Sequence, residues 1–211
     1  MKILVTGGSR GIGKSIVEKY KREGHHVYYP TREELDLSKK PTLPWADFDV
    51  IINNAGINII KSLPHVSGNE VMQVNYLSPL DIIQQCLPHM VKNKWGRIIN
   101  IGSIWIESTK PNRLEYNASK HALHALTKSV TAEYANHNIL CNTVSPGYIE
   151  TDMTFENNSM EIINEIRKNT PIRRLGKPDE VADLVYYLTQ NNNFITGQNI
   201  NIDGGFLCTT Y

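Results

Sequence analysis

Short apolar runs alternate with stretches of helical periodicity along the whole chain. Short, almost purely apolar runs are typical of strands buried on both faces of a parallel sheet. Their alternation with helices predicts an α/β fold, in a single domain that covers residues 1–211. We expect strands at residues 1–5, 26–29, 34–38, 50–53, 97–103, 139–145 and 199–202. We expect helices at residues 14–23, 69–92, 117–123 and 160–168, and a further long helix that begins at residue 178.

The first apolar run leads directly into a glycine-rich turn, and a helical pattern follows at once. The turn reads Thr-Gly-Gly-Ser-Arg-Gly-Ile-Gly over residues 6–13, and the helix after it should bury Ile16, Val17 and Tyr20. Glycines in this context allow a tight turn and bring the main chain close to a pyrophosphate, which the helix N-terminus also favours. An ordinary glycine turn is the alternative, but the strand before it and the helix after it favour a nucleotide site.

Composition and charge narrow the range of functions. The chain has 211 residues, of which 40% are hydrophobic, which suits one domain with a substantial core. Its 22 basic and 21 acidic residues give a formal net charge of +1, so we expect no nucleic-acid or membrane partner. The three cysteines lack CxxC spacing, which argues against disulfides and favours a reducing compartment. With no signal-peptide or membrane-spanning pattern, we expect a cytoplasmic protein.

A tyrosine and a lysine four residues apart form the strongest chemical candidate. Tyr116 and Lys120 share one face if this stretch is helical, so the phenol and the ammonium can meet. A free tyrosine titrates near pH 10, and a fixed positive charge beside it would lower its pKa toward neutrality. Such a pair also occurs by chance on many solvated helix faces. Only the nucleotide motif elsewhere in the chain gives it weight as an acid/base group.

The order and spacing of these motifs resemble the short-chain dehydrogenase/reductase family. The resemblance covers essentially the whole chain, and it implies a Rossmann-type, doubly wound parallel sheet with a shortened region around the third strand. Residues 170–181 and 195–205 look most like β-ketoacyl-[acyl-carrier-protein] reductases, although relatives with other substrates share these passages. The remaining family motifs are Asn-Asn-Ala-Gly at 53–56, Asn75, Ser103, Pro-Gly at 146–147 and Thr-Gly at 196–197.

By this resemblance, Ser103, Tyr116, Lys120 and Asn75 form the catalytic group of an oxidoreductase that reduces a carbonyl to a secondary alcohol, or runs the reverse. Ser103 would hold the substrate carbonyl, and Tyr116 would exchange a proton with its oxygen. Lys120 would lower the tyrosine pKa and bind the nicotinamide ribose, while Asn75 would complete a water-linked proton relay. Because Ser103 and Tyr116 would polarise the carbonyl, we expect no metal.

The position after the second strand indicates which nicotinamide cofactor binds. NAD-dependent members of the family usually carry an acid there, but this chain has the uncharged Thr31, followed by Arg32. Arg10 in the glycine turn adds a second guanidinium, and two such groups suit a 2′-phosphate, so we expect NADP(H) rather than NAD(H). The resemblance assigns cofactor contacts to Gly7, Ser9, Arg10, Gly11, Ile12, Gly13, Arg32, Asp36, Asn54, Ala55, Gly56, Tyr116, Lys120, Pro146, Gly147, Ile149 and Thr151.

Residues 33–49 are shorter than the family pattern requires. Pro41 and Pro44 make a long helix after the expected third strand unfavourable. We therefore expect one face of the sheet near the adenine to be thinly covered. Either an exposed edge or a partner subunit would follow from this, and the resemblance implies a homodimer or homotetramer that pairs through the helices carrying Asn75 and Tyr116.

The sequence leaves the substrate open. We expect the pocket wall to include Trp105, Glu107, Arg113 and Tyr148, with a mobile lid over residues 150–175. A 3-oxoacyl thioester and a keto sugar are both candidates, and a keto sugar would use Glu107 and Arg113 as hydrogen-bonding groups. A catalytically idle NADP(H)-binding redox sensor or scaffold is the alternative from another functional class.

Overall fold

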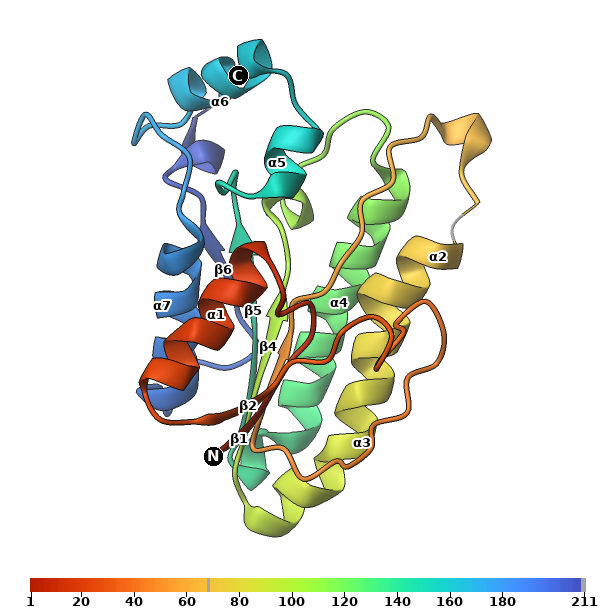
Figure 1. Cartoon of the computed structure of the whole chain (residues 1–211), viewed down its shortest axis with the longest axis vertical. Coiled ribbons are helices and arrows are strands. Elements are labelled where there is room, and N and C mark those ends of the chain that lie inside the picture. The colour runs from red at the N-terminus through yellow and green to blue at the C-terminus, as the bar shows by residue number, and fades with distance from the viewer. Residues whose placement is uncertain (68, 210–211) are drawn as a thin grey trace.

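A computed structural model of the chain describes residues 1–67 and 69–209, so residues 68, 210 and 211 of the expected domain lie outside the described residues. Its centre is one parallel sheet of six strands in the order β2-β1-β3-β4-β5-β6 (Figure 1). The strands are β1 (Lys2–Val5), β2 (His26–Tyr28), β3 (Val50–Asn53), β4 (Gly96–Ile101), β5 (Ile139–Pro146) and β6 (Asn199–Ile202). The predicted α/β class is confirmed.

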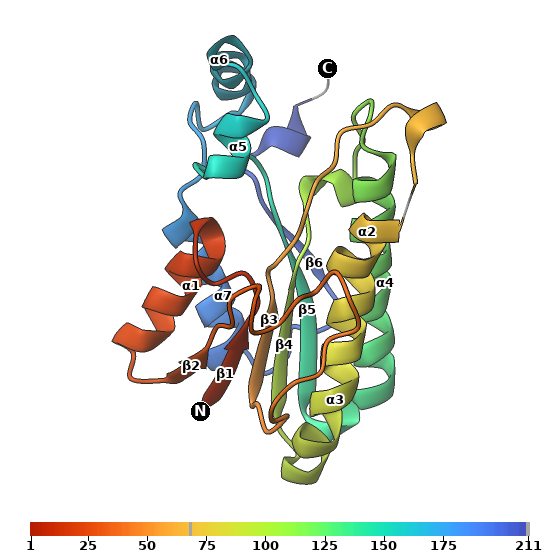
Figure 2. The same cartoon turned by 45° about the vertical axis from the view of Figure 1, so that its right-hand side comes forward.

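Helices cover both faces of this sheet, which makes a three-layer molecule (Figure 2). Helices α1 and α7 lie on one face, and α2, α3 and α4 lie on the other, while α5 and α6 stand beyond the carboxyl ends of the strands. The α-helices are α1 (Gly11–Arg22), α2 (Asn69–Met72), α3 (Ser78–Asn93), α4 (Leu114–Tyr134), α5 (Asp152–Glu156), α6 (Met160–Asn169) and α7 (Pro178–Gln190). Short 3₁₀ turns occur at Leu63–His65, Ile104–Ile106, Ala135–His137 and Phe206–Cys208.

Within the described residues, apart from a small third cluster of Ile163, Ile166 and Leu175, the core consists of two apolar clusters, one on each side of the sheet. Strands β3 and β4 alternate between them, because successive side chains of a strand point to opposite faces. Ile52 and Ile99 pack toward α1 and α7, whereas Ile51 and Ile98 pack toward α3 and α4. Every residue of β3, β4 and β5 is buried, including polar residues such as Arg97 of β4 and Asn142 of β5.

Helix α1 places the glycine turn at the edge of the sheet. Ile16, Val17 and Tyr20 are buried as predicted, and they form one face that packs on the sheet beside α7. Gly24 ends this segment with a φ of +78°, a left-handed conformation that glycine adopts without steric cost. The local pattern therefore fixes both ends of the helix that follows the turn.

The long helix predicted over residues 69–92 is continuous but not uniform. Residues Gln73–Leu77 form a π-helical turn between α2 and α3. A π turn adds one residue to the helical repeat, and such turns often occur at functional sites. Asn75 lies inside this turn, where the extra residue directs its side chain toward the end of β3.

The predicted third strand at residues 34–38 is wrong. Within the described chain the sheet has six strands, and these residues form turns beside β2. The Asp36 carboxylate accepts hydrogen bonds from the Ser38 N–H at 3.0 Å and from its Oγ at 2.7 Å. Thr31 and Glu34 exchange similar bonds. These short-range bonds stabilise turns in competition with a strand.

The shortened segment nevertheless covers the sheet, so the expected thin cover near the adenine end is wrong as well. Leu35, Leu43 and Phe48 are 7%, 8% and 1% exposed and pack against α3 in the core cluster of that face. Ser78 Oγ donates to the Leu37 carbonyl at 2.8 Å, and Gln85 Nε2 donates to the Pro41 carbonyl at 3.1 Å. The segment is hydrogen-bonded to α3 as an extended loop, and its apolar side chains cover this face of the sheet in place of a helix.

None of the helices within residues 1–67 and 69–209 is both long enough and apolar enough to cross a bilayer.

Candidate active site

The carboxyl ends of the strands open onto a cavity of about 390 Å³. This is the edge at which open parallel sheets bind ligands. The cavity runs from Arg32 and Asp36 at one end to Ser103 and Tyr116 at the other. Every residue that the resemblance assigns to the cofactor lines it, and so do Ser103, Tyr116 and Lys120 from the predicted catalytic group. Asn75 lies just outside this lining. The assigned residues that line the cavity come from six separate stretches of the sequence, which the fold brings together.

The glycine turn forms a close-fitting main-chain cradle at one end of the cavity. Gly7 and Gly11 have φ values of +65° and +52°, which other residues rarely adopt. A Cβ atom at Gly13 would lie 2.1 Å from the Gly7 carbonyl oxygen, so only glycine fits there. The turn therefore presents main chain and a helix N-terminus to the cavity. This arrangement fits the pyrophosphate of a dinucleotide.

Asn54 ties the glycine turn to the end of β3. Its Nδ2 donates to the carbonyl oxygens of Thr6 and Gly7, both at 3.0 Å. Thr6 Oγ1 in turn accepts from the N–H groups of Asn54 and Ala55, both at 3.1 Å. The resemblance assigns Asn54 and Ala55 to the cofactor, and the structure adds that their hydrogen bonds with Thr6 and Gly7 join the ends of β1 and β3.

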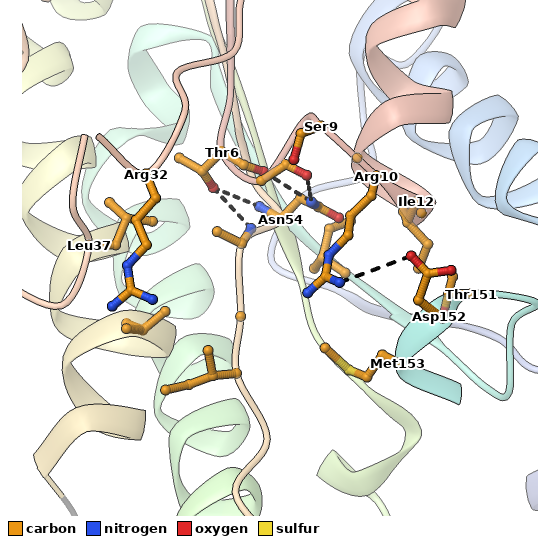
Figure 3. A pocket seen from close by; sticks show the side chains of 18 of the residues that line it. Thr6, Ser9, Arg10, Ile12, Arg32, Leu37, Asn54, Thr151, Asp152 and Met153 are labelled. Carbon is orange, nitrogen blue, oxygen red and sulfur yellow. Dashed lines mark hydrogen bonds and ion pairs between the residues drawn. The ribbon is translucent and has the colours of Figure 1, made fainter. Parts of the chain in front are cut away.

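Two arginines reach into the cavity from opposite sides (Figure 3). Arg32 follows β2, and its Nε lies 3.8 Å from an Asp36 oxygen. Arg10 comes from the glycine turn, and its guanidinium lies 4.0 Å from Asp152. Both side chains are largely exposed, so these ion pairs are weak and can be exchanged for contacts with a phosphate. Glu34 bonds to the Thr31 N–H but does not line the cavity.

Helix α4 and strand β4 bring Tyr116, Lys120 and Ser103 together. Ser103 follows β4 directly, and its Oγ accepts the Trp105 N–H at 3.3 Å. Lys120 Nζ donates to the Ile101 carbonyl at 2.7 Å and lies 5.6 Å from the centre of the Tyr116 ring. The side chains meet because residues four apart share a helix face.

Burial shifts the pKa values of both members of this pair. Burial raises the pKa of the Tyr116 hydroxyl, while a hydrogen bond to Ser103 and the charge of Arg113 oppose the rise. Burial also lowers the pKa of Lys120 to about 8, because the desolvated ammonium loses hydration. The lowering of the tyrosine pKa that the resemblance assigns to Lys120 stays a prediction, because the positive charge that opposes the rise here is that of Arg113. Desolvation outweighs the positive charges, and Tyr116 carries its proton at neutral pH.

Asn75 connects the catalytic helix to the end of β3. Its Oδ1 accepts the Ile57 N–H and its Nδ2 donates to the Ile57 carbonyl, both at 2.9 Å. The same Nδ2 donates to Ser119 Oγ at 2.9 Å. A Cβ atom at Gly56 would lie 3.3 Å from Asn75 Oδ1 and 3.5 Å from Lys120 Nζ, so the three residues are close neighbours. The relay that the resemblance assigns to Asn75 stays a prediction.

A smaller pocket of about 100 Å³ adjoins Ser103 and Tyr116. Trp105, Arg113 and Tyr148 line it as predicted, and the Trp105 and Tyr148 rings meet edge to face at 6.2 Å. The expectation that Glu107 lines this pocket is wrong. Its Oε1 accepts Asn199 Nδ2 at 2.9 Å, and it does not line the pocket.

Several residues of this pocket were missed from the sequence. Asn58 follows the Asn-Ala-Gly motif by two positions, so its place after β3 was the signal that could have found it. Asn157 and Asn158 belong to the segment expected to form a lid, but a polar surface stretch does not reveal which of its side chains turn inward. The missed lining residues are Asn58, Met153, Thr154, Asn157 and Asn158.

Comparisons with known proteins agree with this arrangement. The model of the family described as enoyl-(acyl carrier protein) reductase matches residues 36–207. The 3-oxoacyl-[acyl-carrier-protein] reductase FabG of Aquifex aeolicus is 33% identical over 237 residues, with 96% of this chain and 95% of that protein covered.

Solved structures give the same result. ElxO with NADP bound is 29% identical with a TM-score of 0.88, and the match covers 99% of each chain. A 4-hydroxyisoleucine dehydrogenase complexed with NADH is 27% identical with a TM-score of 0.89, again over 99% of each chain. These relatives differ in the nicotinamide cofactor that they hold.

Proposed function

The chain belongs to the short-chain dehydrogenase/reductase family and is an NAD(P)-dependent oxidoreductase, and we propose that it uses NADP(H) to reduce a carbonyl to a secondary alcohol. The observation that carries this proposal is the single cavity that joins the glycine cradle to Ser103, Tyr116 and Lys120. A dinucleotide laid along it would reach from the two arginines to the catalytic group. The ElxO structure with NADP supports the choice of cofactor for this chain.

The residues present fit such a cofactor. The cradle leaves no room for a Cβ atom at Gly7 and Gly13, Gly11 adopts a left-handed φ, and the cradle would take the pyrophosphate. Arg10 and Arg32 would take the 2′-phosphate, since their ion pairs within the protein are long and exposed. Pro146, Gly147, Ile149 and Thr151 would line the nicotinamide end. When bound, NADPH supplies a hydride to the carbonyl carbon of the substrate.

Ser103 and Tyr116 act on the carbonyl oxygen. Ser103 Oγ donates a hydrogen bond that holds the carbonyl in place, and Tyr116 gives its proton to the oxygen as negative charge develops there. The raised pKa of Tyr116 suits this direction, because the phenol is protonated at neutral pH and can serve as the acid. Lys120, held by the Ile101 carbonyl, places a positive charge beside the phenol while its proton is away.

The test compares the parent with Tyr116→Phe. We expect the parent to oxidise NADPH with a member of a carbonyl panel that holds acetoacetyl thioesters, keto sugars and short oxo acids. The variant should bind NADPH as the parent does but lose about 10²- to 10⁴-fold in kcat, since it has no proton to give. Absorbance of the reduced nicotinamide reports turnover, and calorimetric titration reports binding.

Tyr187→Phe is the matched control. Tyr187 is 48% exposed on α7, away from the cavity, so the same chemical change there should leave kcat unaltered. A parent protein that binds NADPH but turns over no compound, with Tyr116→Phe indistinguishable from it, would contradict the reductase and favour the redox sensor. NADH bound more tightly than NADPH would contradict the cofactor assignment.

We also propose a homodimer or homotetramer that pairs through the helices that carry Asn75 and Tyr116. Leu77 and Leu114 support this, because they are 40% and 50% exposed on these two helices. Such exposed apolar side chains favour association when they gather on one surface. Light scattering that gave the mass of one chain, 23.9 kDa, would contradict the proposal.

A further inference from the structure

Arg113 is a buried cation in the pocket beside the catalytic tyrosine. Its side chain lies in the loop before α4, and only 8% of the residue is exposed. Its NH1 donates to Asn58 Oδ1 at 3.2 Å, which is a neutral partner. Among residues 1–67 and 69–209, no carboxylate forms an ion pair with it. A guanidinium has five N–H donors, so most of its binding capacity is left for a ligand.

The surroundings of Arg113 add positive charge and no negative charge. Lys110 lines the same pocket, and no described Asp or Glu does so. Glu115, Asp152 and Glu156 are adjacent in sequence to lining residues, but none of them lines the pocket. Glu115 Oε1 accepts the Ser67 N–H at 2.9 Å, and Asp152 lies 4.0 Å from Arg10. The other polar side chains at the wall are neutral: Asn58, Ser103, Trp105, Tyr116, Tyr148, Thr154, Asn157 and Asn158.

A buried guanidinium without a counter-ion is costly, because it loses hydration and gains no opposite charge. Burial lowers the pKa of Arg113, but arginine titrates so high that the group stays charged at neutral pH. A pocket with this charge is electrostatically complete only when an anion enters it. Arginine binds a carboxylate with two parallel hydrogen bonds, which also fixes the orientation of the ligand.

We propose that the substrate is a short oxo acid, or the matching hydroxy acid, whose carboxylate binds Arg113 while its carbonyl meets Ser103 and Tyr116. The proposal rests on the proposed reductase function and names its substrate class. The pocket of about 100 Å³ suits a compact molecule better than a long acyl chain. The edge-to-face contact of Trp105 and Tyr148 closes one side of it.

The reaction balances with one proton from solvent. Bound NADPH would supply one hydride to the carbonyl carbon, the C=O π pair would move to oxygen, and the Tyr116 proton would complete the alcohol. A solvent proton would then restore the Tyr116 phenol. The carboxylate is unchanged and keeps its bonds to Arg113 throughout. It therefore contributes to binding and orientation, and it takes no part in the electron transfer.

Another role for Arg113 makes a different prediction. Its charge opposes the rise in the Tyr116 pKa. Under this alternative, Arg113 would adjust the acidity of the phenol and would not bind a carboxylate. In that case its removal would lower kcat equally for charged and neutral substrates and shift the pH profile. As a carboxylate site, its removal should weaken the binding of acids alone.

The experiment uses pyruvate, acetoacetate and laevulinate, each beside its methyl ester, with the NADP⁺ complex of the full chain. Calorimetric titration measures binding, and NADPH oxidation measures kcat and KM across pH. At least one acid should bind 10-fold or more tightly than its ester. Arg113→Gln should weaken that acid about 10- to 100-fold, as expected for a lost charge-assisted pair, and leave the ester unchanged. Arg113→Lys should fall between the two.

Arg22→Gln is the matched control, because Arg22 is exposed at the end of α1 and should behave as the parent. Acids that bind no better than their esters overturn the proposal, and this comparison needs no variant to fold. Equal weakening of acid and ester by Arg113→Gln, with a shifted pH profile, also overturns it. Selective binding of an acid without turnover of any compound supports the carboxylate site and counts against the reductase.

Discussion

At the cofactor end of the cleft a main-chain cradle of glycines shapes part of the wall, whereas at the substrate end large side chains do so. The cofactor end is shaped by Gly7, Gly11 and Gly13, which leave no space for a Cβ atom or adopt left-handed conformations. The substrate end is shaped by Trp105, Arg113 and Tyr148. A main-chain surface changes only if the fold changes, but a side-chain surface changes with one substitution. The fold therefore specifies the shared dinucleotide, and a few replaceable side chains specify the substrate.

The largest effect should follow from adding one methyl group to the main-chain wall. In Gly13→Ala the new Cβ would lie 2.1 Å from the Gly7 carbonyl, so the turn must move. We expect the free energy of unfolding to fall by about 1–3 kcal/mol from overpacking, and the NADPH affinity to fall at least about tenfold. Urea denaturation and calorimetric titration measure the two quantities.

Gly24→Ala is the control for Gly13→Ala. Gly24 also has a positive φ, +78°, but a Cβ atom there meets no atom within 4 Å. It should cost about 1 kcal/mol through backbone strain alone and leave NADPH binding unaltered. NADPH binding by Gly13→Ala at the affinity of the parent would break the comparison between the two ends.

Lys120 lies where the two ends meet, and its charge should set a pH dependence of stability. Burial lowers its pKa from 10.5 to about 8, so between these values the folded protein binds fewer protons than the unfolded chain. The free energy of unfolding of the parent should therefore rise from pH 8 to pH 10.5. Below pH 8 the buried charge exerts its full penalty.

Lys120→Met removes this charge. At pH 7 it should raise the free energy of unfolding by about 1–3 kcal/mol, the lost Ile101 bond offsetting part of the gain, and it should abolish the rise at alkaline pH. Lys128→Met, at an exposed position of the same helix, is the control and should leave the rise in place. A parent whose stability is flat across this range in urea denaturation would contradict the buried charge.

Arg32 is the exception at the cofactor end, because it acts there through a side chain. Arg32→Gln should weaken NADPH binding about tenfold, the loss of one charge-assisted phosphate contact, and leave NADH binding unchanged. Arg22→Gln, remote from the cavity, should alter neither affinity. Titration of both cofactors decides the point, and equal weakening of NADPH and NADH would show that Arg32 does not meet the 2′-phosphate.

The smallest effect should come from the loop that replaces the expected third strand. Ser78→Ala removes the bond to the Leu37 carbonyl and should lower the free energy of unfolding by about 1 kcal/mol. The NADPH affinity should change little, because the glycine cradle is held by other contacts. Ser129→Ala, exposed on α4, is the control in the same urea denaturation. A large loss of NADPH affinity in Ser78→Ala would show that the loop positions the adenine.

Most of the fold could be predicted from local patterns, and the exceptions are informative. Strands β3, β4 and β5 are buried along their whole length, and their apolar positions were enough to predict them although β4 and β5 also hold polar residues. Residues 34–38 also contain apolar positions, Leu35 and Leu37, that suggested a strand. The Asp36 carboxylate, however, accepts hydrogen bonds from Ser38 and stabilises a turn. Such side-chain bonds compete with a strand without changing the hydrophobic pattern.

The sequence by itself determined the glycine turn, the helix after it and the Tyr116–Lys120 pair, because each depends on spacings of a few residues. Only the tertiary structure decided which partners the charged side chains have. Glu107 bonds to Asn199, 92 residues away, and Arg113 bonds to Asn58, 55 residues away. Burial, which raises the Tyr116 pKa, is likewise a property of the packed fold. Contacts between distant residues depend on the path of the whole chain, so no local pattern reveals that Arg113 is buried without an acid.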